Sequence, residues 1–365
     1  MTRCFLNFCQ ANRDILFKNK FIFIFLIHKS LWRRVMSVIQ KDWSEECFIS
    51  ALFQFDEVVV RGPDATQFVS NFTTANIKGL KKDQCCDGFF CDARGWILEI
   101  AVLLRSDDCL IIRVARGRGH GLVAHLDRYH IREDLTIYQT QEGLYSVLVS
   151  GSEGRTWLDN YFDVSVPVNR YQQIQARDGA DHFSTRSTSA QLMPVDWISS
   201  DCFLITVPYE RKDVLHSSLL DARLQNSPDE MITYLRLQQG WPSVNDIPEK
   251  TLPQEMGLNN RAVSLTKGCY LGQETVARLD ALGHVNRRLM VLEVEQGDSP
   301  LVGDNVVSNN KVISQVTSVG FLEKRAVSLA MAIVPLKSIQ RDACLTVGDR
   351  VARVVSAPLL DKLRT

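Results

Sequence analysis

The chain has 365 residues, too many for one ordinary hydrophobic core, which predicts roughly two or three domains. Hydrophobic residues make up 45% and charged residues 23%, a composition typical of a soluble globular protein and not of a disordered, fibrous or repetitive one. Lys plus Arg and Asp plus Glu both number 42, so the balanced charge excludes a general nucleic-acid coat, which needs a strong basic excess.

The first 35 residues differ in composition from the rest. The run 21–27 (FIFIFLI) is apolar, but its seven residues fall far short of the ~20 that span a bilayer. No small-residue cleavage site of a signal peptide follows it. We favour translation that begins at Met36, with a membrane or organelle-targeting leader as the alternative, and we leave residues 1–35 out of the fold.

A strand–turn–helix unit is predicted next. Dense hydrophobic residues over 52–60 predict a buried strand, and the sequence RGPD at 61–64 closes it in a turn. A helix then begins at Asp64, because Phe68 and Phe72 recur at helical spacing.

Two strands joined by a tight turn follow. They are predicted at 89–91 and 96–104, with Gly95 supplying the backbone angle that the turn 92–95 (DARG) requires. Further strands are predicted at 109–114, 145–149 and 203–207, and helices at 122–131, 155–162 and 217–224. Strands and helices do not alternate regularly, so this part of the chain is α+β.

Two glycine- or proline-rich segments carry less information. The segment 117–121 (GRGHG) matches the spacing of neither common phosphate-binding loop, so an ordinary loop between strand and helix is preferred. The stretch 241–260 contains three prolines and Gly257, and we expect it to be irregular and surface-exposed.

From Arg287 onward, short β-rich runs alternate with turns and predict an all-β C-terminal domain, a small barrel. The runs lie at 289–294, 305–307, 312–319, 327–334, 345–347 and 351–355. We place the boundary near 284–288, which gives a folded region at 36–285, with two subdomains, and a barrel at 286–365.

The ten cysteines form no CxxC, and no His pair completes a zinc spacing. Cys85, Cys86 and Cys91 lie close together but match no common cluster signature. Reduced thiols in a cytoplasmic protein, without a metal, are therefore expected.

The chemically richest segment is 267–278 (KGCYLGQETVAR). Glycines on both sides of Cys269 free the backbone to turn, and Gln273 can begin a helix whose N–H groups favour an anion. Together with Lys267, this helix start would favour the reactive thiolate of Cys269.

A plainer alternative fits the same residues. Cys269 would be an inert buried thiol, and Glu274 and Arg278 an ordinary pair one helical turn apart. No His lies beside Cys269 in the sequence, so a Cys–His hydrolase has no positive support. The residues alone leave the reactive and the inert thiol equally open.

The segment 267–278 resembles the KGCYxGQExxxR signature of YgfZ-type proteins, in the glycine-cleavage T-protein (aminomethyltransferase-like) superfamily. The similarity extends over residues ~50–350. It includes VRGPD at 60–64 with Phe68, DARG at 92–95, Arg236, Gly240, Pro242, LPQE at 252–255, Leu258, Arg287, Leu289 and VTS at 316–318.

The resemblance implies a T-protein-like fold of antiparallel sheets and helices around a central folate hole, followed by the small C-terminal β-barrel. It implies tetrahydrofolate or a derivative as the ligand, and a role in supporting iron–sulfur enzymes or their assembly machinery and tRNA modification, without a membrane partner. Cys269 would be the functional thiol, assisted by Lys267 and Glu274. The residues assigned to cofactor binding are Asp92, Arg94, Glu99, Tyr270, Gln273 and Arg278.

The departures from catalytic T-proteins disfavour the glycine-cleavage reaction. Aminomethyltransferases carry paired aspartates after the equivalent of Gly95, where this chain has WILEI at 96–100, and 199–202 (SSDC) lacks their folate-binding glutamate. The alternatives are a folate-dependent aminomethyl or methyl transferase that uses Glu99, and a scaffold that has lost its ligand. Direct tRNA binding through Arg113, Arg116 and Arg118 is not expected, because a solvated surface explains these arginines on a neutral chain.

Overall fold

The computed structural model divides the chain into two units, Met1–Trp43 and Ser44–Thr365. It describes residues 48–140, 143–162, 174–177, 189–222, 224, 226–282, 285–295, 300–322, 327–339, 344–355, 357 and 359–360, all within the second unit. The leader expected at 1–35 lies outside the described residues. Within the ranges just given, no helix is both long and apolar enough to cross a membrane.

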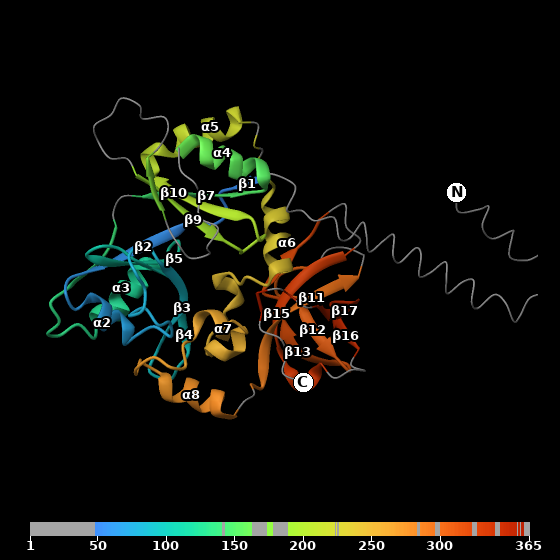
Figure 1. Cartoon of the computed structure of the whole chain (residues 1–365). Helices are drawn as coiled ribbons and strands as arrows, with labels where there is room; N and C mark the ends of the chain where they lie inside the picture. Colours follow the sequence, from blue (N-terminus) through green and yellow to red (C-terminus); the bar gives the residue numbers. More distant parts are fainter. Residues whose placement is uncertain are drawn as a thin grey trace, which may run out of the picture. The chain divides into compact units, whose positions relative to one another are not determined.

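The first sheet has the antiparallel order β3-β4-β5-β2-β6 (Figure 1). Its strands are β2 (Phe55–Arg61), β3 (Cys85–Cys91), β4 (Ile97–Arg105), β5 (Cys109–Ala115) and β6 (Thr136–Gln139), and its helices are α2 (Ala65–Ser70) and α3 (Gly119–Asp127). Val58, Leu103 and Ile112 of the sheet pack with Phe68 of α2 and Leu122 of α3. Because side chains alternate along a strand, the opposite face of this sheet is left for other parts of the chain.

The second sheet has the antiparallel order β1-β7-β10-β9-β8. Its strands are β1 (Phe48–Ser50), β7 (Leu144–Ser150), β8 (Ile174–Arg177), β9 (Ser189–Val195) and β10 (Cys202–Pro208). Helices α4 (Ser152–Phe162) and α5 (Lys212–Asp221) cover it (Figure 1). Leu158 of α4 and Leu215 of α5 pack with Val147, Leu192 and Ile205 of the sheet.

The C-terminal sheet has the antiparallel order β13-β12-β16-β17-β11-β15-β14. Its strands are β11 (Arg287–Glu295), β12 (Asn305–Ser308), β13 (Lys311–Gln315), β14 (Ser318–Gly320), β15 (Val327–Pro335), β16 (Leu345–Val347) and β17 (Arg350–Val355). The sheet curls around its own core, and the Ser314 hydroxyl of β13 donates to the Ile333 carbonyl of β15 at 2.6 Å. The predicted β-rich runs are confirmed, except that 312–319 is split into β13 and β14. Between these two strands, the backbone N–H of Thr317 donates to the Met331 carbonyl.

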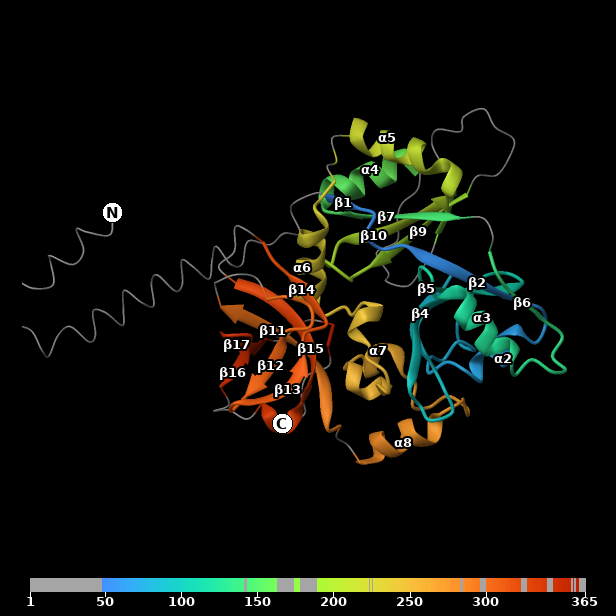
Figure 2. The same cartoon turned by 180° about the vertical axis from the view of Figure 1, so that it is seen from behind.

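The segment between the second and the C-terminal sheet contains α6 (Asp229–Gln239), two 3-10 turns (Val244–Asp246 and Pro253–Met256), α7 (Asn259–Ala262) and α8 (Gln273–Leu282). Both views place α7 between the first sheet and the C-terminal sheet (Figures 1 and 2). The stretch 241–260 is irregular as predicted, but the prediction that it is surface-exposed is wrong. Trp241, Thr251 and Met256 are buried, because this stretch fills the space between the sheets.

The strand–turn–helix at β2 and α2 and the β3–β4 hairpin agree with the sequence-based predictions. Helices α3, α4 and α5 are confirmed with ends displaced by a few residues. The sequence did not predict helices α6 and α7, the edge strands β1, β6 and β8, or strand β9. The described part is therefore a mixed α/β fold whose sheets are antiparallel.

Candidate functional site

The DARG turn and the cysteine loop contact each other through two glycines. Gly95 (φ +84°) and Gly272 (φ +80°) both adopt the left-handed conformation that favours glycine. A Cβ atom on Gly272 would lie 2.5 Å from the Asp92 carbonyl oxygen and 2.6 Å from the Gly95 Cα. Two motifs that are distant in the sequence therefore form one rigid contact.

Lys267 anchors the other end of this loop. Its ammonium donates to the carbonyl oxygens of Ser70 (2.7 Å), Thr73 (2.6 Å) and Ala75 (3.0 Å), at the end of α2. Burial and the nearby Lys78 lower the pKa of Lys267 to about 8. The lysine thus holds the loop against the first sheet, and its donors are directed to the backbone.

Cys269 is exposed at the tip of the anchored loop. Tyr270 beside it is buried, and its backbone N–H donates to Gln273 Oε1 at 3.2 Å where α8 begins. Glu274 and Arg278 are exposed on the surface of α8. The loop therefore presents its thiol to solvent and keeps its aromatic ring inside.

The three clustered cysteines differ from Cys269. Burial, with the Asp87 carboxylate, raises the pKa of Cys86 to about 12. Burial, with Asp92, raises the pKa of Cys91 to about 12 as well, and burial also raises the pKa of Cys85. These thiols stay protonated near neutral pH, which leaves Cys269 as the accessible thiol of this region.

A pocket of about 590 Å³ lies beside α3 and gathers three of the predicted cofactor-binding residues, Asp92, Arg94 and Glu99. The Asp92 carboxylate accepts the backbone N–H groups of Arg94 and Trp96, both at 2.9 Å, and so fixes the DARG turn. Glu99 accepts from Arg118 Nε at 2.7 Å. Burial raises the pKa of Glu99 to about 7, although Arg118 opposes the shift.

A larger cavity of about 920 Å³ is lined by residues of the first sheet, of the C-terminal sheet and of the segment around α6. Its lining includes Phe55, Ile100 and Arg113 of the first sheet, Trp197 after β9, Arg236 of α6, and Ile333 of the C-terminal sheet. Glu99 does not line it. Neighbouring residues of a strand point to opposite faces of the sheet, and on β4 Ile100 faces this cavity whereas Glu99 faces the pocket beside α3. The structure thus separates Glu99 from the central cavity.

Two tryptophans form an aromatic wall of this cavity. The rings of Trp197 and Trp241 stack with centroids 5.3 Å apart and planes 13° apart. The Arg261 guanidinium lies 5.0 Å from the Trp241 ring centroid and binds Asp87 at 2.5 Å and Asp196 at 2.8 Å. The chain's own groups thus pack on the rings of this wall and hold them in place.

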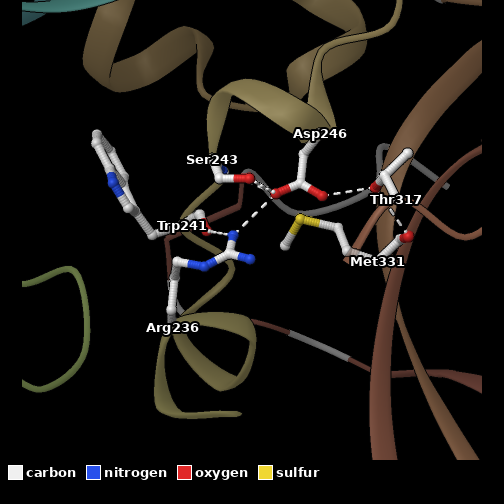
Figure 3. A network of polar contacts seen from close by, with 6 residues as sticks. All are labelled: Arg236, Trp241, Ser243, Asp246, Thr317 and Met331. Carbon is white, nitrogen blue, oxygen red and sulfur yellow. Dashed lines mark hydrogen bonds and ion pairs between the residues drawn. The ribbon is translucent and has the colours of Figure 1, made fainter. Parts of the chain in front are cut away.

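A buried polar network supports the cavity from the side of α6 (Figure 3). The fully buried Asp246 carboxylate accepts from Arg236 Nη1 at 2.8 Å, from the Ser243 hydroxyl at 2.9 Å and from the Thr317 hydroxyl at 2.5 Å. Burial alone would raise the pKa of Asp246, but Arg236 and these hydrogen bonds hold it below its ordinary value. Arg236 also donates to the Trp241 carbonyl at 2.7 Å, so the network fixes the aromatic wall.

The glycine-rich segment 117–121 is an ordinary helix entry, as the spacing indicated. The backbone N–H groups of Gly117 and Gly119 both donate to the Asp56 carboxylate, at 2.8 and 2.9 Å. The chain's own carboxylate thus occupies these donors.

The three nearby arginines do not form a common surface groove. Arg113 is buried, whereas Arg116 and Arg118 are exposed. Arg116 donates to the Leu144 carbonyl at 2.9 Å.

Sequence reasoning found the cysteine loop and the DARG turn but missed most of the central cavity. Trp197 lies just before the segment 199–202 (SSDC), which has no glutamate, and Trp241 lies in the stretch predicted to be exposed. Arg236 appeared only as part of the resemblance. A tryptophan in a region without hydrophobic periodicity was the available signal for this wall.

The sequence profile of the GCVT N-terminal domain family matches residues 10–267 of the chain. A solved structure with the same fold is the glycine cleavage system aminomethyltransferase T from Bartonella henselae, at a TM-score of 0.71 and 20% identity, covering 87% of each chain. The chain therefore belongs to the GCVT N-terminal domain family, and its fold is that of the T-proteins.

Similarity to proteins named YgfZ places the chain in the YgfZ-type branch of this family. The chain is 26% identical to the tRNA-modifying protein YgfZ of Serratia proteamaculans, over 68% of this chain and 72% of the relative. It is 24% identical to the protein of the same name from Aliivibrio fischeri, over 79% and 85%. It is also 24% identical, over 84% and 69%, to a chloroplastic protein of Arabidopsis thaliana whose name assigns it provisionally to the transferases.

Proposed function

We propose that this protein is a cytoplasmic folate-binding accessory protein that supports iron–sulfur enzymes and tRNA modification through Cys269. The observation that carries the proposal is the exposed Cys269 thiol on a loop held by Lys267 at one end and by the Gly95–Gly272 contact at the other. A thiol that is presented on a fixed loop suits exchange with a partner's sulfur or metal centre, whereas a packing cysteine would be buried.

The central cavity fits a folate. Its volume of about 920 Å³ lies in the range of small-molecule and cofactor sites. Phe55, Ile100 and Val102 give the cavity an apolar wall against which a pterin ring can pack. Tetrahydrofolate, when bound, would supply a carrier for one-carbon units, and the chain's own residues would bind and orient it.

Aminomethyl or methyl transfer is not favoured, because the wall that β4 gives to the cavity is apolar. Ile100 and Val102 stand there, and the one carboxylate of β4, Glu99, faces the pocket beside α3 and is paired with Arg118. A reaction that needs a carboxylate at the reacting nitrogen has no group from β4 to perform it.

Replacement of the thiol tests the accessory role. In cells that lack the protein, Cys269→Ala should fail to restore iron–sulfur enzyme activity and tRNA modification, while the protein stays folded because the side chain is exposed. Cys344→Ala is the matched control, since Cys344 is the other described cysteine that is exposed. Full complementation by Cys269→Ala, or an equal loss in both variants, would refute the role of Cys269.

Folate binding is tested separately by calorimetric titration of the full chain with tetrahydrofolate under anaerobic, reducing conditions. Saturable one-to-one binding is expected if the central cavity is the site. The absence of binding would leave a scaffold without a ligand as the better description.

A further inference from the structure

A buried ion pair stands on the face of the first sheet that lines the central cavity. Arg113 lies directly across from Glu57 on β2 and from Val102 on β4. The Arg113 Nε donates to Glu57 Oε1 at 2.8 Å, and the two side chains are only 1% and 7% exposed. The pair is therefore withdrawn from water, but Arg113 is part of the cavity wall.

Three nitrogens of the cavity wall have no acceptor among the described residues. They are Nη1 and Nη2 of Arg113 and Nε1 of Trp197. Among the described residues, no other residue that lines this cavity contributes such an atom. The polar atoms of the described wall that have no hydrogen-bond partner are thus all donors. Burying a donor without an acceptor costs enough free energy to indicate that an acceptor binds there.

The charges indicate what kind of acceptor fits. Glu57 already neutralises the Arg113 guanidinium, so a carboxylate in the same place would bring a second negative charge into a buried site. A neutral carbonyl oxygen can accept from these donors without that penalty. The apolar wall that Phe55, Ile100 and Val102 give to the cavity also favours a flat ring that carries the oxygen.

We propose that Arg113 and Trp197 form a donor pair that binds the oxo group of a pterin ring, and so orient the ligand with its ring toward the first sheet. This assignment rests on folate binding as proposed above, and deepens it by naming the residues that recognise the ring. The acidic tail of the ligand then points away from the Arg113–Glu57 pair.

The test is calorimetric titration of the full chain with three probes: tetrahydrofolate, 6-methyltetrahydropterin, which has the ring alone, and p-aminobenzoylglutamate, which has the tail alone. Arg113→Lys keeps the charge but loses the paired donors, and Trp197→Phe keeps a ring but loses Nε1. We expect ~10–100-fold weaker binding of the first two probes to Arg113→Lys and ~3–10-fold weaker binding to Trp197→Phe. The tail probe should bind both variants as it binds the wild type.

Matched controls are Arg105→Lys at the end of β4 and Trp157→Phe on α4, neither of which lines the cavity. Each variant is first checked by thermal melting. Should Arg113→Lys fail to fold, the double variant Glu57→Leu/Arg113→Met replaces the buried pair by apolar groups that such sites often tolerate. That variant should likewise lose affinity for 6-methyltetrahydropterin.

The outcomes are distinct. If the wild type binds tetrahydrofolate and neither variant weakens it, ordered water satisfies these donors and the donor pair is refuted, while folate binding stands. If Arg113→Lys weakens only p-aminobenzoylglutamate, the pair binds the ligand's carboxylate and the ring assignment is wrong. If the wild type binds none of the probes, both proposals fall.

Discussion

At the residue scale, the contact between Gly95 and Gly272 holds the cysteine loop in place. Gly272→Ala should lower the free energy of unfolding by about 2–5 kcal/mol, because a residue with a Cβ costs roughly 1–2 kcal/mol in the left-handed region and overpacking costs roughly 1–3 kcal/mol more. The Asp92 carbonyl, 2.5 Å from the new atom, belongs to backbone and cannot rotate away. Urea denaturation measures the change.

Gly268 in the same loop gives the control. No heavy atom lies within 4 Å of the Cβ that alanine would add there. Gly268→Ala should therefore change the unfolding free energy by less than about 0.5 kcal/mol. Similar losses in both variants would show that the loop is not held by the glycine contact.

Glu99 makes stability depend on pH. Its pKa is raised to about 7 by burial, from 4.5, so between these values the folded chain binds more protons than the unfolded chain and stability falls as pH rises. Glu99→Gln keeps an acceptor for Arg118 but does not titrate. As the pH rises from 5 to 8, the unfolding free energy of the variant should therefore increase by about 1–3 kcal/mol relative to that of the wild type.

Urea denaturation at the two pH values gives the difference. Glu274→Gln on the exposed surface of α8 is the control and should show no such change. A Glu99→Gln difference that is the same at both pH values would mean that Glu99 ionises in the pocket as it does in water.

At the element scale, Asp246 joins α6, a 3-10 turn and the C-terminal sheet. Asp246→Asn leaves the buried Arg236 guanidinium without its counter-charge and should lower the unfolding free energy by about 3–5 kcal/mol. Thr317→Val removes one hydrogen bond to the same carboxylate and should cost about 1–2 kcal/mol. Both values come from denaturant titration.

The double variant Asp246→Asn/Thr317→Val tests whether the two segments act together. Since the residues share one network, the double loss should be smaller than the sum of the single losses by about 0.5–3 kcal/mol. Strict additivity would indicate that the C-terminal sheet is held to α6 by other contacts.

Local sequence patterns predicted those elements that contain a turn motif or a run of β-branched residues. The RGPD and DARG turns and the β-branched runs after Arg287 identify strands and hairpins because their signals are local. Helix α6 was missed although Ile232 and Leu235 stand at helical spacing, since polar residues make up six of its eleven positions. The buried stretch 241–260 was misjudged, because its position is set by the Arg236–Asp246 network and not by hydrophobic periodicity.

The candidate site was predictable only in part for a similar reason. The cysteine loop is a compact sequence motif, so it could be found and its helix start at Gln273 placed correctly. The contact of Gly95 with Gly272, the stacking of Trp197 on Trp241 and the inward place of Ile100 all depend on tertiary structure. A single sequence contains no local signal for such contacts.

At the scale of the described unit, the central cavity makes a ligand a common partner of the first sheet, the C-terminal sheet and α6. A folate at ~100 times its dissociation constant should then raise the unfolding free energy by about 2.7 kcal/mol, because it binds only the folded chain. Since the lining residues come from the first sheet, the C-terminal sheet and α6, the thermal transition of these parts should move upward together.

Tryptophan fluorescence localises this binding. Trp197 and Trp241 stack in the cavity wall, whereas Trp157 stacks on Tyr161 of α4, with centroids 4.8 Å apart. Trp241→Phe should remove a large part of the fluorescence change caused by tetrahydrofolate, and Trp157→Phe should leave that change intact. If instead the Trp157 variant loses the signal and the Trp241 variant keeps it, the ligand binds at the second sheet, and the central cavity does not bind folate.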